Sequence, residues 1–121
     1  MTTFIAAMSG VEVTLQSAAT TGNGTTIAIP PSFNYHNFKI TAASGVTAGA
    51  VTIEISNDPN DTNTWAALPS TPTQPVTVMA GADLLVPYTG RINFVRARIS
   101  TTISGGANPS VTVTYFGAKQ Y

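Results

Sequence analysis

The sequence predicts an all-β fold, a single antiparallel β-sandwich or jelly-roll-like barrel of about seven strands. In short segments, apolar residues alternate with polar ones at every second position, which is the period of a half-buried strand. Clusters of Gly, Pro, Ser and Asn separate these segments, and no stretch keeps a helical period. With 121 residues, the chain has the usual size of one domain.

Each expected strand carries this alternation. Val51, Ile53 and Ile55 share one face of their segment, for example, and Thr52 and Glu54 share the other. The expected strands are residues 11–15, 25–29, 38–42, 51–55, 76–79, 92–99 and 111–116. The expected turns, rich in Gly, Pro and Asn, are residues 21–24, 30–31, 44–45, 58–61, 81, 89–90 and 105–106.

Residues 1–10 are expected to form an N-terminal arm or a first edge strand, ahead of a sandwich domain at 11–121. The apolar side chains Phe4, Ile5 and Met8 are candidate contacts with a neighbouring subunit, although packing on the chain's own core is an equal alternative. This segment has no basic region, and its apolar run is too short for a signal peptide or a membrane span. Synthesis in the cytoplasm is therefore expected.

Charge is the most unusual feature of the composition. Charged residues make up 8% of the chain, and five basic and five acidic residues cancel, whereas about 25% is typical. Twenty Thr and nine Ser provide polarity instead. A neutral chain is poorly suited to phosphate backbones or acidic membranes, so neither nucleic acid nor membrane is an expected partner. Contact with other copies or other proteins is expected, with a soluble monomer as the alternative.

Strand alternation also places the few charges. Glu54 and Lys39 are expected on outward faces. Arg96 and Arg98 share a face with Ile92 and Phe94, a conflict that a bulge near Phe94 or a strand covered on both sides would resolve. The arginine pair is a candidate phosphate site or inter-subunit contact, but cross-strand pairing with Glu54 is the favoured interpretation.

Catalysis is disfavoured by elimination. The chain has no cysteine and hence no disulfide or thiolate metal site. His36 is the single histidine; without a nucleophile motif, a surface or partly packed side chain is expected there. The carboxylates offer no obvious catalytic pair; they are Glu12, Glu54, Asp58, Asp61 and Asp83. The chain is expected to be no enzyme and to bind no cofactor.

Residues 57–63 offer oxygen-bearing side chains of the kind that calcium prefers. The segment fails the EF-hand pattern, because Asn63 stands where Gly is required and Pro69 where Glu is required. A turn stabilised by Asp and Pro is the favoured interpretation, and no metal is expected.

The aromatic residues allow a second class of function. Trp65, Tyr35, Tyr88 and Tyr115 would suit sugar stacking if they formed a planar row. Trp65 as a plug of the core, covering one end of the sandwich, is the favoured interpretation.

Residues 51–58, 64–68, 88–99, 105–106 and 111–115 together resemble small β-sandwich structural proteins of tailed bacteriophage virions, of the head-decoration (cement) type. The resemblance implies a non-enzymatic virion component, assembled in the host cytoplasm, that binds the major capsid protein and sister copies. It also implies a homo-oligomer, with a trimer favoured for a decoration protein. A tail, neck or fibre component and a carbohydrate-binding module are the alternatives.

Overall fold

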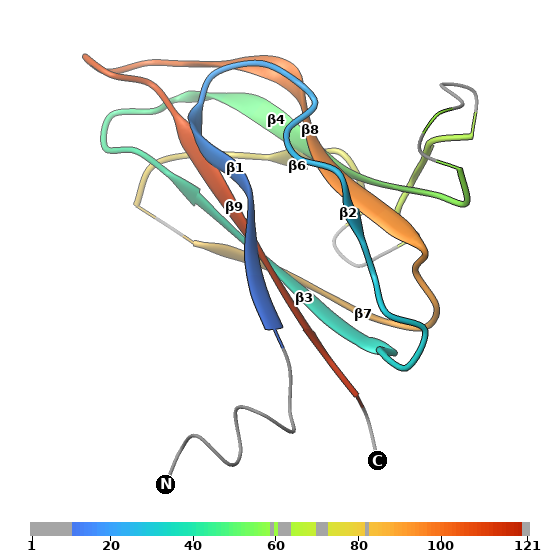
Figure 1. Cartoon of the computed structure of the whole chain (residues 1–121). Coiled ribbons are helices and arrows are strands. Elements are labelled where there is room, and N and C mark those ends of the chain that lie inside the picture. Colours follow the sequence, from blue (N-terminus) through green and yellow to red (C-terminus); the bar gives the residue numbers. More distant parts are fainter. Residues whose placement is uncertain (1–10, 59, 61–63, 70–72, 82, 120–121) are drawn as a thin grey trace, which may run out of the picture.

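The computed structural model describes residues 11–58, 60, 64–69, 73–81 and 83–119. The regular structure in these residues is entirely β-strand (Figure 1). The strands are β1 (Val11–Ala19), β2 (Ile27–Ala28), β3 (Tyr35–Ala42), β4 (Ala48–Ser56), β5 (Ala66–Ala67), β6 (Val76–Thr77), β7 (Leu84–Thr89), β8 (Phe94–Ser104) and β9 (Val111–Ala118). No helix that could cross a membrane occurs in this part of the chain.

The strands form two antiparallel sheets. One has the order β1-β9-β3-β7, and the other has the order β2-β8-β4-β5, with β6 also pairing with β4. Phe38 of β3 lies opposite Tyr115 of β9, and Ile53 of β4 lies opposite Ala97 of β8. The predicted β-sandwich is therefore confirmed.

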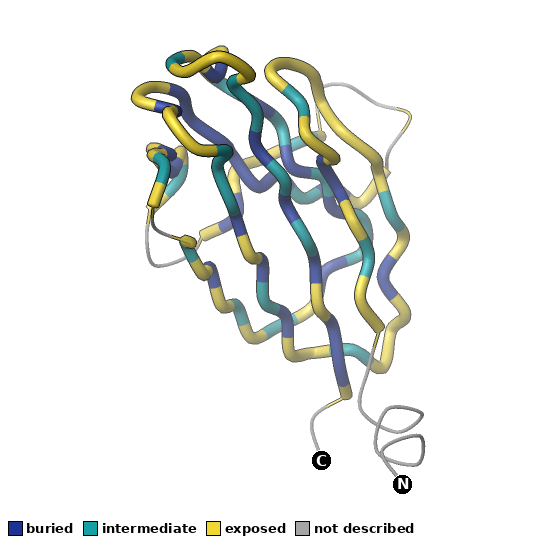
Figure 2. Tube along the Cα trace, turned by 90° about the vertical axis from the view of Figure 1, so that its left-hand side faces the viewer, coloured by how far each residue is buried: buried dark blue, intermediate teal, exposed yellow. Residues whose placement is uncertain are grey.

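The core lies between the sheets, because each long strand turns alternate side chains inward. Buried positions alternate with more exposed ones along β3, β8 and β9 (Figure 2), whereas β4 is buried continuously from Gly49 to Glu54. The largest fully buried side chains are Tyr115, Phe38, Leu15, Ile40, Ile53, Leu68, Ile92 and Ile103.

The structure has more strands than the predicted seven. All seven expected segments contain a strand, but β5 and β7 were not expected. β7 holds Pro87 and two adjacent leucines, Leu84 and Leu85, which obscure its alternation. Proline is tolerated there because β7 is an edge strand.

The conflict within residues 92–99 has a simple solution. Ile92 is buried but precedes β8, which begins at Phe94. From that residue the alternation is regular: Val95, Ala97 and Ile99 point inward. The pairing with β4 is regular from Phe94 to Ile99, so of the two alternatives the bulge near Phe94 is absent. The register shifts lie instead on both sides of Ala50.

Candidate functional site

The outer side of the four-stranded sheet carries a shallow groove of about 370 Å³. We call the surface around this groove the outward face. It is lined by Glu12, Thr14, Asn37, Lys39, Leu85, Thr114 and Phe116, which come from all four strands of the sheet.

The pairing of the strands brings these side chains together. Asn37 of β3 lies between Phe116 of β9 and Pro87 of β7. One step along β3, Lys39 lies between Thr114 and Leu85. Because residues two apart on a strand share a face, two rows of side chains cross the sheet side by side.

The outward face combines exposed apolar side chains with polar and charged ones. Leu85 is 57% exposed and Phe116 is 38% exposed, and Tyr35 also projects from this side of β3. Lys39 makes an ion pair with Asp83 at 3.4 Å. The side-chain oxygen of Asn37 is buried and has no hydrogen-bond partner among the described residues. A surface that holds both exposed apolar side chains and an unpaired acceptor is suited to a partner that supplies apolar side chains and N–H donors.

The edges of this sheet are protected, although lysines are scarce. β1 is irregular at two points, between Thr14 and Gln16 and between Gln16 and Ala19, and Ala18 has a φ of 47°. At the opposite edge, Pro87 has no N–H to offer to an added strand. Irregular strands and prolines both hinder edge-to-edge pairing, so this sheet is better suited to contacts through its face.

Arg96 and Arg98 lie on the outer side of the other sheet, where both bind Glu54. The Arg96 Nε donates to one carboxylate oxygen of Glu54 at 2.8 Å, and the Arg98 Nε donates to the other at 3.0 Å. The predicted pairing is therefore confirmed. Glu54 lies on the expected outward face of its strand, but it is only 8% exposed there.

Trp65 belongs to this cluster and is not the expected plug of the core. The Arg96 guanidinium lies 4.2 Å from the centre of the Trp65 ring, a cation–π contact. The ring is half-buried on the outer side of the sheet. In the chain, Trp65 immediately precedes the short strand β5, which begins at Ala66. The Arg96 side chain is 18% exposed and that of Arg98 is 41% exposed, so Arg98 is the more accessible of the two for a contact between subunits.

His36 is fully buried, so the expected surface or partly packed position was wrong. The Tyr115 hydroxyl lies 2.7 Å from Nδ1, and the Gly90 carbonyl lies 2.8 Å from Nε2. Since a carbonyl only accepts, Nε2 carries the proton and Nδ1 accepts from Tyr115. Burial lowers the pKa of His36, and the bond to Gly90 opposes this shift. With both ring nitrogens engaged inside the fold, the imidazole has a structural role.

Tyr115 is also fully buried, which removes it from the hypothetical row of sugar-stacking rings. Its ring contacts those of His36 and Phe38, at centroid distances of 5.8 and 5.3 Å. Tyr88 is half-buried against His36 at 6.2 Å. The four aromatic residues therefore do not form one exposed row.

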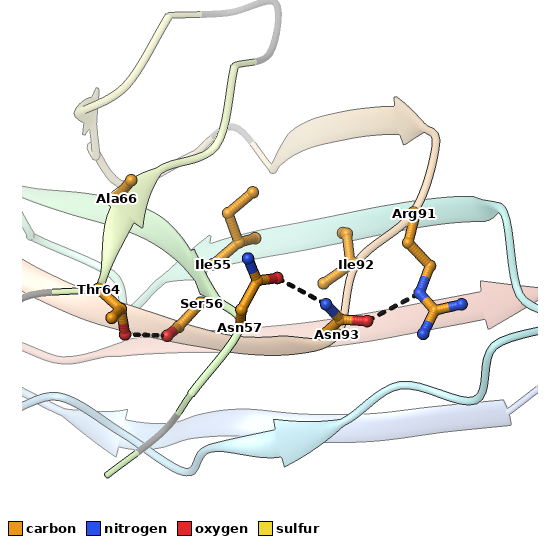
Figure 3. A pocket seen from close by; sticks show the side chains of 8 residues that line it. All are labelled: Ile55, Ser56, Asn57, Thr64, Ala66, Arg91, Ile92 and Asn93. Atoms are coloured by element: carbon orange, nitrogen blue, oxygen red, sulfur yellow. Dashed lines mark hydrogen bonds between the residues drawn. The ribbon is translucent and has the colours of Figure 1, made fainter. Parts of the chain in front are cut away.

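The polar segment that follows β4 lies beside a smaller pocket of about 190 Å³ (Figure 3). The Ser56 and Thr64 hydroxyls hydrogen-bond to each other, and both lie within hydrogen-bond distance of the Asp58 backbone carbonyl, which accepts from the one whose proton is not used between them. The Asn60 N–H donates to the Asp58 carboxylate at 3.0 Å, as in an Asx turn. The described part of the segment thus has the turn structure that was favoured over a calcium site; residues 59 and 61–63 lie outside it.

Three hydrogen-bonded polar side chains line one side of this pocket. The Asn93 side-chain amide donates to the side-chain oxygen of Asn57 at 2.6 Å, and the Arg91 Nε donates to the side-chain oxygen of Asn93 at 2.8 Å (Figure 3). Over the described residues, no group of three or more His, Cys, Asp or Glu side chains could hold a metal ion.

Leu85 and Phe116, the main apolar residues of the outward face, were missed by sequence reasoning. The available signal was a break in alternation, since each stands directly beside an inward-facing residue, Leu84 and Tyr115 respectively. Two adjacent large apolar residues on a strand place one of them outside the core. The candidate contacts Phe4, Ile5 and Met8 lie outside the described residues.

The chain is a small antiparallel β-sandwich whose four-stranded sheet exposes apolar side chains on its outer side. The chain is similar in structure to the SPBc2 prophage-derived protein YomS, with a TM-score of 0.65 and 17% sequence identity over 91% of this chain and 93% of that chain. At this identity the likeness is one of fold. No protein-family model matches the sequence, and no curated protein matches it.

Proposed function

We propose that the chain is a non-enzymatic structural protein of a tailed bacteriophage particle, a capsid decoration (cement) protein that binds the major capsid protein and sister copies. The particle is its site of action, and stabilisation comes from protein–protein contacts. The proposal includes homo-oligomers, with a trimer favoured, and needs no cofactor, nucleic acid or membrane.

The observation that carries this proposal is the outward face. Leu85, Phe116 and Tyr35 expose apolar surface beside threonines on one side of the molecule, and burial of such surface drives protein association. YomS is prophage-derived, as its name says, and the two chains share a fold over nearly their full lengths. This likeness supports the proposal that the chain is a phage protein. The internal use of both His36 nitrogens supports a role without catalysis.

Removal of the chain from the phage particle tests the proposal. Particles assembled without it should package DNA but release that DNA at a lower temperature, and addition of the purified chain should restore the original temperature. Release is measured by the fluorescence of a DNA-binding dye during heating. Particles that hold DNA equally well without the chain would contradict a cementing role.

The copy number separates decoration from a tail or neck role. Quantitative mass spectrometry of purified particles should find the chain in amounts comparable to the major capsid protein, because a cement protein covers the shell. A few copies per particle, together with heads that lack tails when the chain is removed, would identify a ring-forming neck or tail component instead. A fibre component would be found at low copy number on the detached tails.

A further inference from the structure

The outward face combines two features that together specify a kind of occupant. Leu85 and Phe116 offer exposed apolar surface beside the groove. Beside Phe116 across the sheet, Asn37 holds a side-chain oxygen that is buried and unpaired among the described residues. The terminal torsion of an Asn side chain is soft, so rotation about it can present this acceptor to an occupant of the groove that Asn37 lines. An extended peptide supplies both apolar side chains and N–H donors.

The chain itself contains a segment of this chemistry. Residues 2–8 carry no charged side chain, and Phe4, Ile5 and Met8 are large and apolar. They lie just upstream of β1, which contributes Glu12 and Thr14 to the groove. The apolar side chains of this segment therefore match Leu85 and Phe116 at the groove, whose other lining residues are polar or charged and can pair with backbone N–H and C=O groups.

The direction of β1 favours the groove of a neighbouring copy over the chain's own groove. Val11 lies opposite Gly117, one residue before β9 ends at Ala118. The groove lies in the opposite direction along β1, at Glu12 and Thr14. A segment that precedes Val11 would need an immediate reversal to reach its own groove. The ten residues before Val11 would span about 33 Å if extended, and a four-stranded sheet is about 15 Å across. The segment is therefore long enough to cross the sheet of a second copy.

We propose that residues 2–8 of one copy occupy the groove on the outward face of a second copy of this chain in solution. The zero net charge of the chain means that copies approach without strong repulsion. This inference deepens the proposed function, on which it rests for its biological setting, because it names the contact between sister copies. Its test uses purified protein without particles, so its outcome does not depend on that of the particle experiments.

The absence of cysteine from the sequence makes disulfide trapping a clean test. An Ile5→Cys variant is mixed with a Leu85→Cys variant under mild oxidation. A mixed disulfide-linked dimer should form, visible on a non-reducing gel and identified by peptide mass spectrometry. The matched control replaces Leu85→Cys with Met79→Cys, since Met79 is also 57% exposed but lies outside the groove. We expect at least about a tenfold lower yield of mixed dimer from this control.

Two results of the trapping experiment would overturn the proposal. Equal yields from Leu85→Cys and Met79→Cys would mean that the cross-link reports random collision. A double variant, Ile5→Cys with Leu85→Cys, that closes only an internal disulfide at every concentration would assign the segment to its own groove.

Light scattering of uncross-linked protein gives an independent measurement. The full chain should self-associate, and a chain without residues 2–8 should remain monomeric at the same concentration. Leu85→Ser should weaken association about tenfold, because it removes a buried leucine from the contact, whereas Met79→Ser should leave it unchanged. Equal association with and without residues 2–8 would overturn the proposal, whatever the behaviour of the chain on particles.

Discussion

At the scale of single residues, Glu54 shows how a protein with few charged residues uses one of its carboxylates. The side chain is largely buried on the outer side of the sheet, and each of its oxygens accepts from a different arginine. Trp65 lies over one of these arginines. The Glu54 carboxylate therefore stabilises the sheet through its bonds to Arg96 and Arg98.

Replacement of Glu54 by glutamine tests this role. Glu54→Gln leaves Arg96 and Arg98 close together without the charge they share, so the free energy of unfolding should fall by about 1–3 kcal/mol, the lower end reflecting the exposure of Arg98. Urea denaturation measures the change. The matched control is Asp83→Asn, which breaks the exposed pair with Lys39 and should cost less than about 0.5 kcal/mol. Equal losses in the two variants would refute the structural role of Glu54.

Pairing between the arginines and Glu54 was predictable from the sequence, because it depends on alternation along two adjacent strands. The positions of His36 and Trp65 were not. His36 is buried through partners 54 and 79 residues away in the chain, Gly90 and Tyr115. A local pattern contains no information about partners at such separations, so the surroundings of a single histidine or tryptophan are hard to predict from sequence.

At the scale of elements, Gln16 links the two sheets. It is buried at the point where β1 departs from regular pairing with β9. Its side-chain N–H groups donate to the Ala97 carbonyl of β8 at 2.8 Å and to the Gly22 carbonyl at 3.1 Å. The irregularity in β1 thus turns a polar side chain inward, where it is satisfied by the opposite sheet.

The hydrogen bonds of Gln16 to Ala97 and Gly22 predict that Gln16→Glu destabilises the fold. A carboxylate has no proton to donate at neutral pH and would face two carbonyl oxygens, so the free energy of unfolding should fall by about 2–4 kcal/mol. Hydrogen exchange should also rise first in β1. Ser17→Ala, at the exposed adjacent position, is the control and should change stability by less than about 0.5 kcal/mol. A loss in Gln16→Glu no greater than in this control would mean that β1 is held by its pairing with β9 alone.

The existence of most strands followed from the sequence, whereas their extents and their neighbours did not. Alternation located the long strands β3, β4, β8 and β9, since each has one face in the core. β7 was missed because Pro87 and Leu85 disturb its pattern, and those two residues also shape the outward face. The candidate groove could therefore not be predicted from alternation, because residues that form it are also the ones that interrupt the regular strand pattern.

At the scale of the whole molecule, the buried pair of His36 and Tyr115 limits the pH range in which the sandwich is stable. The two side chains join β3 to β9, and His36 also binds Gly90, which follows β7. Burial lowers the pKa of the His36 imidazole below its ordinary value of 6.5. Burial also raises the pKa of the Tyr115 phenol above its ordinary value of 10.0. Both groups are therefore held neutral in the folded protein.

These two shifts predict a plateau of stability between about pH 6.5 and pH 10. Below it, His36 takes up a proton more readily in the unfolded chain than in the fold, so the free energy of unfolding falls with decreasing pH. Above it, Tyr115 loses its proton more readily in the unfolded chain, so the free energy falls with increasing pH. Urea titrations at pH intervals measure both limits. Tyr115→Phe, which has no phenol to ionise, should lower the plateau by about 1–3 kcal/mol, because Nδ1 of His36 loses its donor, and should reduce the alkaline decline. An acid limit that begins only near pH 4, where carboxylates titrate, would show that His36 does not set it.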